Sequence, residues 1–302
     1  MTKYNIAVIL TCFNRREKTL SCLNGLYCAQ EKYNDADIAL GVYLTDDGCS
    51  DGTAQAVKNC FSDKDITILQ GYGNLFWAGG MRLAWNAALK EDRKWDFFLL
   101  LNDDTTPMEN MFHELFNAHS FSLKKKGVPG VYSGVTTDIA DKTIITYGGS
   151  VWVNKFLGTD RRVLPNGIPQ EVDKTNANIL LVAGKVVDKI GIFYSGYHHG
   201  AADYDYSIQA KKAGFSALIT AAPCGVCERD HNNNRKEDRE KILKMSYSQR
   251  KKYFSHPIHS SHDILLFKKR NTPLRYPLVW IGRFLNEKIP HLYYLLDLIR
   301  GE

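Results

Sequence analysis

The first 120 residues alternate between short apolar runs and segments with helical spacing, and this alternation limits the fold more than any other feature. Strand–helix–strand repetition of this kind predicts a parallel sheet with helices on both faces. The runs are almost continuous in apolar residues, as in strands that are buried on both sides. We therefore predict an α/β fold with a mainly parallel central sheet. The apolar runs are Ile6–Leu10, Ala39–Leu44, Ile66–Leu69 and Phe97–Leu101, and the helical segments are Glu17–Tyr27, Thr53–Phe61 and Gly80–Leu89.

Polar residues follow each of the four apolar runs. In open α/β sheets, ligands bind in the crevice outside the carboxyl ends of the strands. Four polar clusters at four successive strand ends should therefore converge on one crevice, and this agreement is stronger evidence than any single motif. The clusters are Thr11–Arg15, Thr45–Thr53, Asn74–Arg82 and Asn102–Thr105.

Length and composition are those of a globular chain. The 302 residues allow one large domain, or one domain with a smaller appendage, and 44% hydrophobic content can form a full core. We find no apolar run long enough to span a bilayer and no pattern typical of a signal peptide. The seven cysteines are irregularly spaced, which favours free thiols over a disulfide or zinc framework. We therefore expect a cytoplasmic protein.

The positive charge is concentrated near the C-terminus. Residues 228–302 hold 16 Lys and Arg against 9 Asp and Glu, a net charge of +7, whereas residues 1–227 sum to −1. This asymmetry favours an anionic surface or partner and argues against a nucleic-acid binder. The stretch 268–300 mixes basic with aromatic and aliphatic residues. It fits helices in a membrane interface, and it fits equally a helical pair that packs on the rest of the protein with a solvated basic face.

Asp103 and Asp104 follow Asn102 at the end of the fourth apolar run. Adjacent carboxylates at a buried strand end repel each other and need a cation or hydrogen-bond donors to stay ionised. Carboxylate ligands suit Mg²⁺ or Mn²⁺, which commonly bridge to phosphate oxygens. The alternative is that one of the two carboxylates caps a helix that starts near Pro107.

Asp46 and Asp47 end the second apolar run, ahead of a turn into the next helix. Ser50 or Asp51 fits the cap of that helix, but capping does not explain the two carboxylates before it. A carboxylate at this position can accept hydrogen bonds from a base or from ribose hydroxyls.

The segment from Phe76 to Arg82 opens the third helix. Gly79 and Gly80 permit close approach to a ligand, and the helix N-terminus and Arg82 both favour a diphosphate. For Phe76 and Trp77, a tight loop with buried aromatic side chains is an equally good interpretation.

With these motifs in this order, residues 4–230 resemble family 2 glycosyltransferases, which have the GT-A fold, a Rossmann-like nucleotide-binding architecture. The closest resemblance is to bacterial members that build surface polysaccharide on a lipid carrier, including rhamnosyltransferases. It implies that Asp104 is a metal ligand for Mg²⁺ or Mn²⁺ and that Asp103 contacts the donor. The other donor contacts that we assign are Thr11, Asn14, Arg15, Asp46, Asp47, Trp77, Gly79, Gly80 and Arg82.

The segment from Gly200 to Gly214 resembles the family's "ED…DL.LR…G" motif, with Ala202 in place of its Glu. The resemblance implies that Asp203 is the catalytic base and that Asp205 is a structural carboxylate. A carboxylate at a helix start can take a proton from an acceptor hydroxyl. The alternative is that Asp203 only caps the helix.

Histidines are frequent after this segment. The resemblance makes His231 the candidate that reaches the metal or the diphosphate. His256, His259 and His262 recur at intervals of three, but Pro257 interrupts any helix there. We expect them to have acceptor or surface roles rather than to bind zinc.

The resemblance as a whole implies inverting transfer of a sugar from a UDP- or dTDP-sugar, with dTDP-rhamnose as one option, to a saccharide or polyprenyl-linked acceptor. The catalytic domain would cover residues 1–230, with a nucleotide-binding half to residue 120 and an acceptor half from 121. Residues 231–302 would form a helical, basic and aromatic extension that attaches peripherally to the inner face of the plasma membrane.

Two other functions are open. A nucleotidyltransferase would normally show a glycine-rich loop with Lys or Arg after the first strand, and Thr11–Arg15 lacks the glycines. A non-catalytic module that binds carbohydrate or a lipid carrier is disfavoured because both Asp104 and Asp203 are present.

Overall fold

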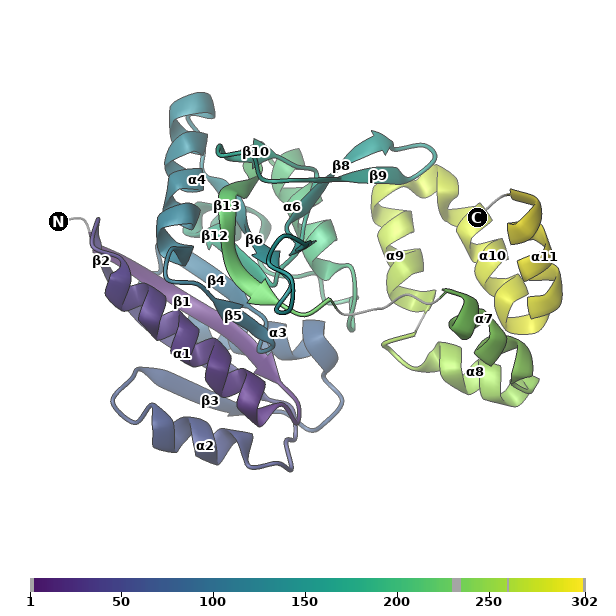
Figure 1. Ribbon diagram of the computed structural model, residues 1–302, viewed down its shortest axis with the longest axis horizontal. Coiled ribbons are helices and arrows are strands. Elements are labelled where there is room, and N and C mark those ends of the chain that lie inside the picture. Colours follow the sequence, from purple (N-terminus) through teal and green to yellow (C-terminus); the bar gives the residue numbers. More distant parts are fainter. Residues whose placement is uncertain (1–2, 230–234, 260, 301–302) are drawn as a thin grey trace.

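One large mixed sheet runs through the molecule and carries most of the core (Figure 1). The computed structural model describes residues 3–229, 235–259 and 261–300. Ten strands form this sheet: β1 (Lys3–Cys12), β2 (Asp37–Asp46), β3 (Ile66–Gln70), β4 (Phe97–Leu101), β5 (Thr105–Pro107), β6 (Gly130–Thr137), β7 (Ile145–Tyr147), β10 (Gln170–Glu171), β12 (Ile179–Ala183) and β13 (Ser216–Cys227). Their order is β10-β13-β6-β12-β4-β1-β2-β3, with β5 paired to β13 and β7 paired to β6.

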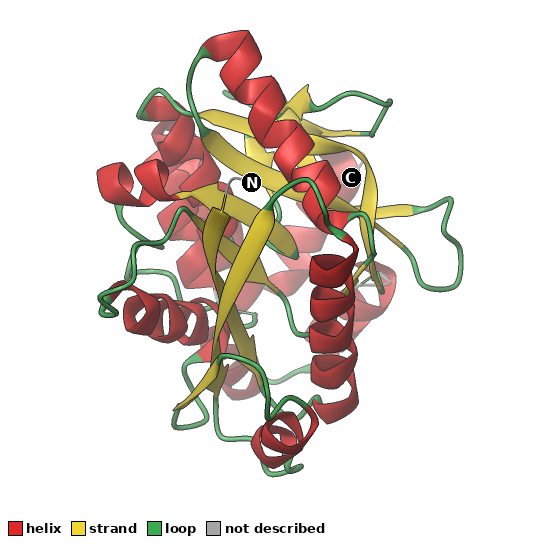
Figure 2. Ribbon diagram, turned by 90° about the vertical axis from the view of Figure 1, so that its left-hand side faces the viewer, coloured by secondary structure: helices red, strands yellow, loops and turns green. Residues whose placement is uncertain are grey.

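The N-terminal strands form the parallel part of the sheet. β1 pairs in parallel with both β2 and β4, and β2 pairs in parallel with β3. The connecting helices are α1 (Arg16–Lys32), α2 (Thr53–Cys60) and α3 (Phe76–Leu89), and helices lie on both sides of the sheet (Figure 2). The predicted strand–helix alternation is confirmed, and each strand ends within two residues of its predicted end.

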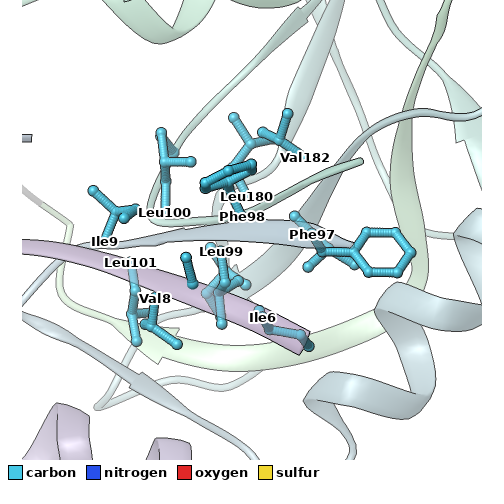
Figure 3. Close-up of a cluster of buried hydrophobic side chains, with 14 of the residues drawn as sticks. Ile6, Val8, Ile9, Phe97, Phe98, Leu99, Leu100, Leu101, Leu180 and Val182 are labelled. Atoms are coloured by element: carbon cyan, nitrogen blue, oxygen red, sulfur yellow. The ribbon is translucent and has the colours of Figure 1, made fainter. Parts of the chain in front are cut away.

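The centre of the sheet is the most apolar part of the chain. All five residues of β4 are buried, and they lie against Ile6, Val8 and Ile9 of β1 (Figure 3). Leu180 and Val182 continue this layer from β12, which is antiparallel to β4. Full burial of one apolar side chain stabilises a fold by about 1.5–3 kcal/mol. The packing of β1, β4 and β12 therefore fixes the positions at which these strands end.

The second half of the chain completes the sheet and adds a smaller one. β12 is antiparallel to β4 and β6, while β13 runs parallel to β6. The three-stranded sheet has the order β11 (Lys174–Thr175), β8 (Gly149–Asn154), β9 (Thr159–Val163). The antiparallel strands predicted between residues 130 and 167 include the β8–β9 hairpin. The helices of this half are α4 (Met111–Lys126), α5 (Gly184–Ile190) and α6 (Ala202–Lys212).

The C-terminal part is helical, as predicted, and has a small core of its own built on Ile242, Phe254 and Tyr294. Its helix α9 packs against α6, and Phe267 of α9 belongs to the main core (Figure 1). Among the described residues, none of the helices combines the length and the apolar character that crossing a bilayer requires. The elements are α7 (Arg235–Lys244), α8 (Tyr247–Ser255), α9 (Ser261–Asn271), the 3₁₀ turn η1 (Pro273–Arg275), α10 (Tyr276–Lys288) and α11 (Pro290–Arg300).

Candidate functional site

The polar clusters that follow β1, β2 and β4 are in contact. Asn14 accepts a hydrogen bond on Oδ1 from the Ser50 N–H at 2.7 Å, which joins the first two clusters. Arg15 donates from Nη1 to Asp104 Oδ2 at 2.5 Å, which joins the first cluster to the fourth. Convergence follows from the topology, because β1 lies between β2 and β4 and all three run in the same direction.

Asp103 and Asp104 form the acidic centre of this crevice. Asp103 is buried, and its Oδ1 lies 3.4 Å from the same Arg15 nitrogen. Burial raises the pKa of Asp103 to about 7, Asp104 adds to the rise, and Arg15 opposes it. Two adjacent carboxylates at a strand end offer the oxygen ligands that Mg²⁺ and Mn²⁺ take, so these residues fit a divalent cation.

The helix-cap alternative for these two carboxylates is wrong. β5 begins at Thr105, directly after Asp104, and α4 begins only at Met111 with Asn110 as its cap residue. β5 pairs with β13 at the edge of the sheet, so the chain after Asp104 continues as a strand and not as a helix.

Asp46 and Asp47 are both buried, and hydrogen bonds from the protein backbone hold them in place. Asp46 Oδ1 accepts the Cys49 N–H at 2.7 Å. Asp47 accepts three backbone N–H groups, from Gly73, Leu75 and Phe76, at 2.9–3.1 Å. Asp47 therefore fixes the loop that leads into α3, a task that the sequence did not reveal because loop geometry decides which N–H groups converge.

The start of α3 is docked on the acidic cluster. Trp77 donates from Nε1 to Asn102 Oδ1 at 2.7 Å, and its ring packs on Phe193. Gly80 is required by the protein itself, because a Cβ there would lie 2.1 Å from Thr11 Oγ1. The structure thus accounts for Gly80 by its contact with Thr11, and its predicted approach to a ligand stays a prediction. At Gly79, a Cβ would come within 3.3 Å of the Leu75 side chain.

Arg82 reaches the loop that precedes α6. It donates from Nη1 to the carbonyl oxygen of Tyr197 at 2.7 Å and to that of Tyr194 at 3.3 Å. Burial lowers the pKa of Arg82. The structure thus assigns Arg82 a positioning task between α3 and this loop, and its contact with a diphosphate stays a prediction.

Asp203 is the second residue of α6, so it is not the cap residue of the alternative interpretation. That place belongs to Ala201, whose φ of 63° is in the left-handed region. Asp203 accepts the Tyr204 N–H on Oδ1 at 2.8 Å and the Ala177 N–H on Oδ2 at 3.1 Å. Burial raises its pKa to about 6, although these N–H groups act in the opposite direction.

A two-residue bridge connects Asp203 to the acidic cluster. Ala177 binds the Asp203 carboxylate, and the next residue, Asn178, accepts the Asn102 N–H on its carbonyl at 3.1 Å. The Asn178 side chain also donates to Thr105 Oγ1 at 3.3 Å. The predicted base and the predicted metal ligand are therefore held in one framework from opposite halves of the chain.

Asp205 is a structural carboxylate, as the resemblance implied. It is buried and pairs with Arg270 Nε at 3.0 and 3.1 Å, and it accepts the Asn271 amide at 2.6 Å. Both partners belong to α9, so Asp205 ties the extension to α6. The predicted metal ligand His231 lies outside the described residues.

The comparisons with known proteins identify the fold. No family model and no curated protein matches the chain. A mannosyltransferase from Pyrobaculum calidifontis, solved with GDP-Man and Mn²⁺, aligns over 99% of this chain and 81% of its own at 15% identity and a TM-score of 0.53. Residues 1–349 of TarS from S. aureus, solved with UDP-GlcNAc, align over 93% and 72% at 11% identity and a TM-score of 0.52. These are GT-A glycosyltransferases, and the chain has the GT-A fold.

Proposed function

We propose that this protein is a glycosyltransferase that takes its sugar from a nucleoside-diphosphate donor. The observation that carries the proposal is the bridge through Ala177 and Asn178, which links Asp203, a carboxylate with a raised pKa at the start of α6, to the acidic cluster that follows β4. The neighbours of the same fold support the donor class, because they were solved with GDP-Man and UDP-GlcNAc.

The proposed chemistry is a single displacement. Asp203 takes the proton of an acceptor hydroxyl while that oxygen attacks the anomeric carbon, and the nucleoside diphosphate leaves from the opposite face. One base and no enzyme nucleophile give inversion at that carbon. A divalent cation held by Asp104, with Asp103 beside it, would supply neutralisation of the charge that develops on the leaving diphosphate. Arg15 forms ion pairs with both carboxylates and would hold them in place.

The proposals for the particular donor, the acceptor and the cellular setting rest on the sequence resemblance. They are a UDP- or dTDP-sugar as donor, with dTDP-rhamnose among the options, and a saccharide or polyprenyl-linked saccharide as acceptor. The setting would be the synthesis of surface polysaccharide at the inner face of the plasma membrane. We place Thr11, Asn14, Asp46 and the start of α3 around the nucleotide.

Turnover of a panel of nucleotide sugars with Mg²⁺ or Mn²⁺ tests this proposal. We expect release of a nucleoside diphosphate, loss of activity in EDTA, and weaker nucleotide binding by Asp104→Ala. A nucleotidyltransferase would release pyrophosphate instead, and a binding module would bind a ligand without turning it over. Full turnover in EDTA would show that the metal is not needed, and it would not contradict the proposed transferase activity.

A further inference from the structure

Two histidines and one aspartate that are distant in sequence meet beside α6. His198 lies in the loop before α6, and His262 and Asp263 lie in the first turn of α9. One ligating atom from each residue lies within 4.8 Å of the other two. Asp263 Oδ1 is 3.5 Å from His198 Nδ1 and 3.1 Å from His262 Nδ1.

The carboxylate of this group is buried and fixed. Asp263 Oδ2 accepts the N–H groups of His199 at 2.7 Å and of Gly200 at 3.0 Å, and the His198 N–H lies 3.1 and 3.2 Å from the two oxygens. Burial acts to raise the pKa of Asp263, but these N–H donors and His262 hold it below its ordinary value. The ionised carboxylate therefore points one oxygen at both imidazoles, as outer hydrogen bonds orient metal-binding carboxylates.

Two of the three spacings between the ligating atoms match those around a small transition-metal ion, and the third is at most 4.8 Å. Bonds of about 2.0–2.1 Å in a tetrahedral site place ligating atoms about 3.3 Å apart. The two distances of 3.5 and 3.1 Å lie on either side of that value. The imidazole side chains are 53% and 51% exposed, so an ion can enter and keep water as its fourth ligand.

We propose that His198, His262 and Asp263 bind a transition-metal dication such as Zn²⁺, at a site separate from the acidic cluster at Asp104. Imidazole nitrogen suits such ions, whereas Mg²⁺ requires oxygen ligands. Our expectation of surface or acceptor roles for His256, His259 and His262 did not foresee this site, because the partner of His262 is His198 and not its neighbours in sequence.

The bound ion would connect the extension to the crevice. The His198 carbonyl accepts the Ala78 N–H at 3.2 Å, so the same loop touches the start of α3. Asp203 follows His198 by five residues in the chain. Metal binding therefore fixes α9 against the segment that carries the proposed base. This inference does not depend on the proposed transferase activity.

The test is a Co²⁺ titration of the full chain, without a polyhistidine tag and without nucleotide, after removal of metal by a chelator. We expect one site with the visible absorption of four-coordinate Co²⁺, and displacement of Co²⁺ by Zn²⁺. His198→Ala and His262→Ala should each weaken this site by at least about 100-fold, since even outer-shell changes cost 10- to 100-fold. Both side chains are half exposed, so the variants should fold.

Three variants serve as controls. Asp104→Ala should keep the Co²⁺ absorption, because the acidic cluster is a different site. His256→Ala removes a nearby exposed imidazole, and His113→Ala removes an exposed one on α4, and both should bind Co²⁺ like the parent. Absence of four-coordinate Co²⁺ in the parent, or equal binding by both histidine variants, would overturn the proposal. Loss of the Co²⁺ absorption in Asp104→Ala would show that the ion binds at the acidic cluster instead.

Discussion

At the scale of single residues, Asp203 stands in an environment that opposes its charge. Two backbone N–H groups stabilise the carboxylate, yet burial outweighs them and raises its pKa to about 6. A general base works best when its pKa is close to the working pH. The same burial that would make Asp203 a usable base at neutral pH also makes its ionised form costly to the fold.

We predict that Asp203→Asn abolishes most transfer and leaves donor binding intact. The amide cannot accept the proton, so the transfer rate should fall by about 10²- to 10⁴-fold. One of the two N–H groups loses its acceptor, which should cost about 1–3 kcal/mol of stability. Transfer rate, nucleotide affinity and thermal midpoint would be measured together.

The matched control is Asp188→Asn, which changes an exposed carboxylate on α5 and should behave like the parent. Asp205→Asn does not serve as a control, because it removes the partner of Arg270. Near-parental transfer by the Asp203 variant would show that another group is the base.

The pH dependence of transfer gives a second prediction for Asp203. Only the ionised form can accept the proton, so kcat/KM should be level above about pH 7 and fall about tenfold per unit well below pH 6. The residual rate of Asp203→Asn should lack this step. A parental profile that stays flat down to pH 5 would contradict the assignment.

The transfer rate should fall as the pH is lowered, whereas the contribution of Asp203 to the free energy of unfolding should rise. The pKa of Asp203 in the folded protein, about 6, lies above its ordinary value of 3.8, so the folded state binds the proton more tightly than the unfolded state does. Ionisation therefore penalises folding above pH 6, and the penalty disappears as the pH falls towards 4. Relative to Asp203→Asn, the parent should gain about 2 kcal/mol in free energy of unfolding between pH 7 and pH 4, measured by urea denaturation.

At the scale of elements, α9 joins the extension to the sheet domain. Its residue Arg270 pairs with the buried Asp205 of α6, its Phe267 enters the main core, and its Asp263 holds the 198–200 loop. These contacts come from one face and both ends of the helix. α9 is therefore part of the framework that positions the start of α6.

We predict that Arg270→Gln lowers the free energy of unfolding by about 3 kcal/mol, because it leaves the Asp205 carboxylate buried beside neutral partners. Asp205→Asn together with Arg270→Gln should cost less than the sum of the single changes. Lys269→Gln, an exposed neighbour on the same helix, is the control and should be within about 0.5 kcal/mol of the parent. Additive losses would show that the pair is not coupled.

The elements also show where sequence reasoning stops. Strands and helices of the first 120 residues could be predicted because apolar periodicity is a local signal, and the convergence of their ends follows from parallel topology alone. Asp47, Arg82 and Asp263 carry tasks that depend on which distant N–H or C=O groups approach them. No residue type or spacing encodes that approach, so these positioning roles became visible only in the structure.

At the scale of the whole molecule, the extension presents an uncovered apolar face. Leu274, Leu278, Trp280, Ile281 and Phe284 are all exposed along η1 and α10, with Trp280 stacked on Phe284. The tip of the β8–β9 hairpin, which bears the exposed Phe156 and Leu157, touches the extension through Arg275. In the C-terminal stretch, α9 packs on the sheet domain and α10 leaves apolar side chains in contact with solvent. Attachment to a membrane stays a prediction.

We predict that this face binds anionic membranes. An apolar helix face inserts at the level of the lipid headgroups, and basic residues near an anionic surface add about 1 kcal/mol each. The segment 228–302 carries a net charge of +7. In vesicle sedimentation, the protein should therefore pellet with anionic vesicles and bind neutral vesicles weakly. High salt should release it, because the attraction between exposed charges is screened.

The double variant Leu278→Ser, Trp280→Ser should reduce binding to anionic vesicles at least tenfold. The control Leu89→Ser, which changes an exposed leucine on α3, should bind like the parent. Equal recovery on neutral and anionic vesicles would contradict the electrostatic part, and unchanged binding by the double variant would place the contact on another face.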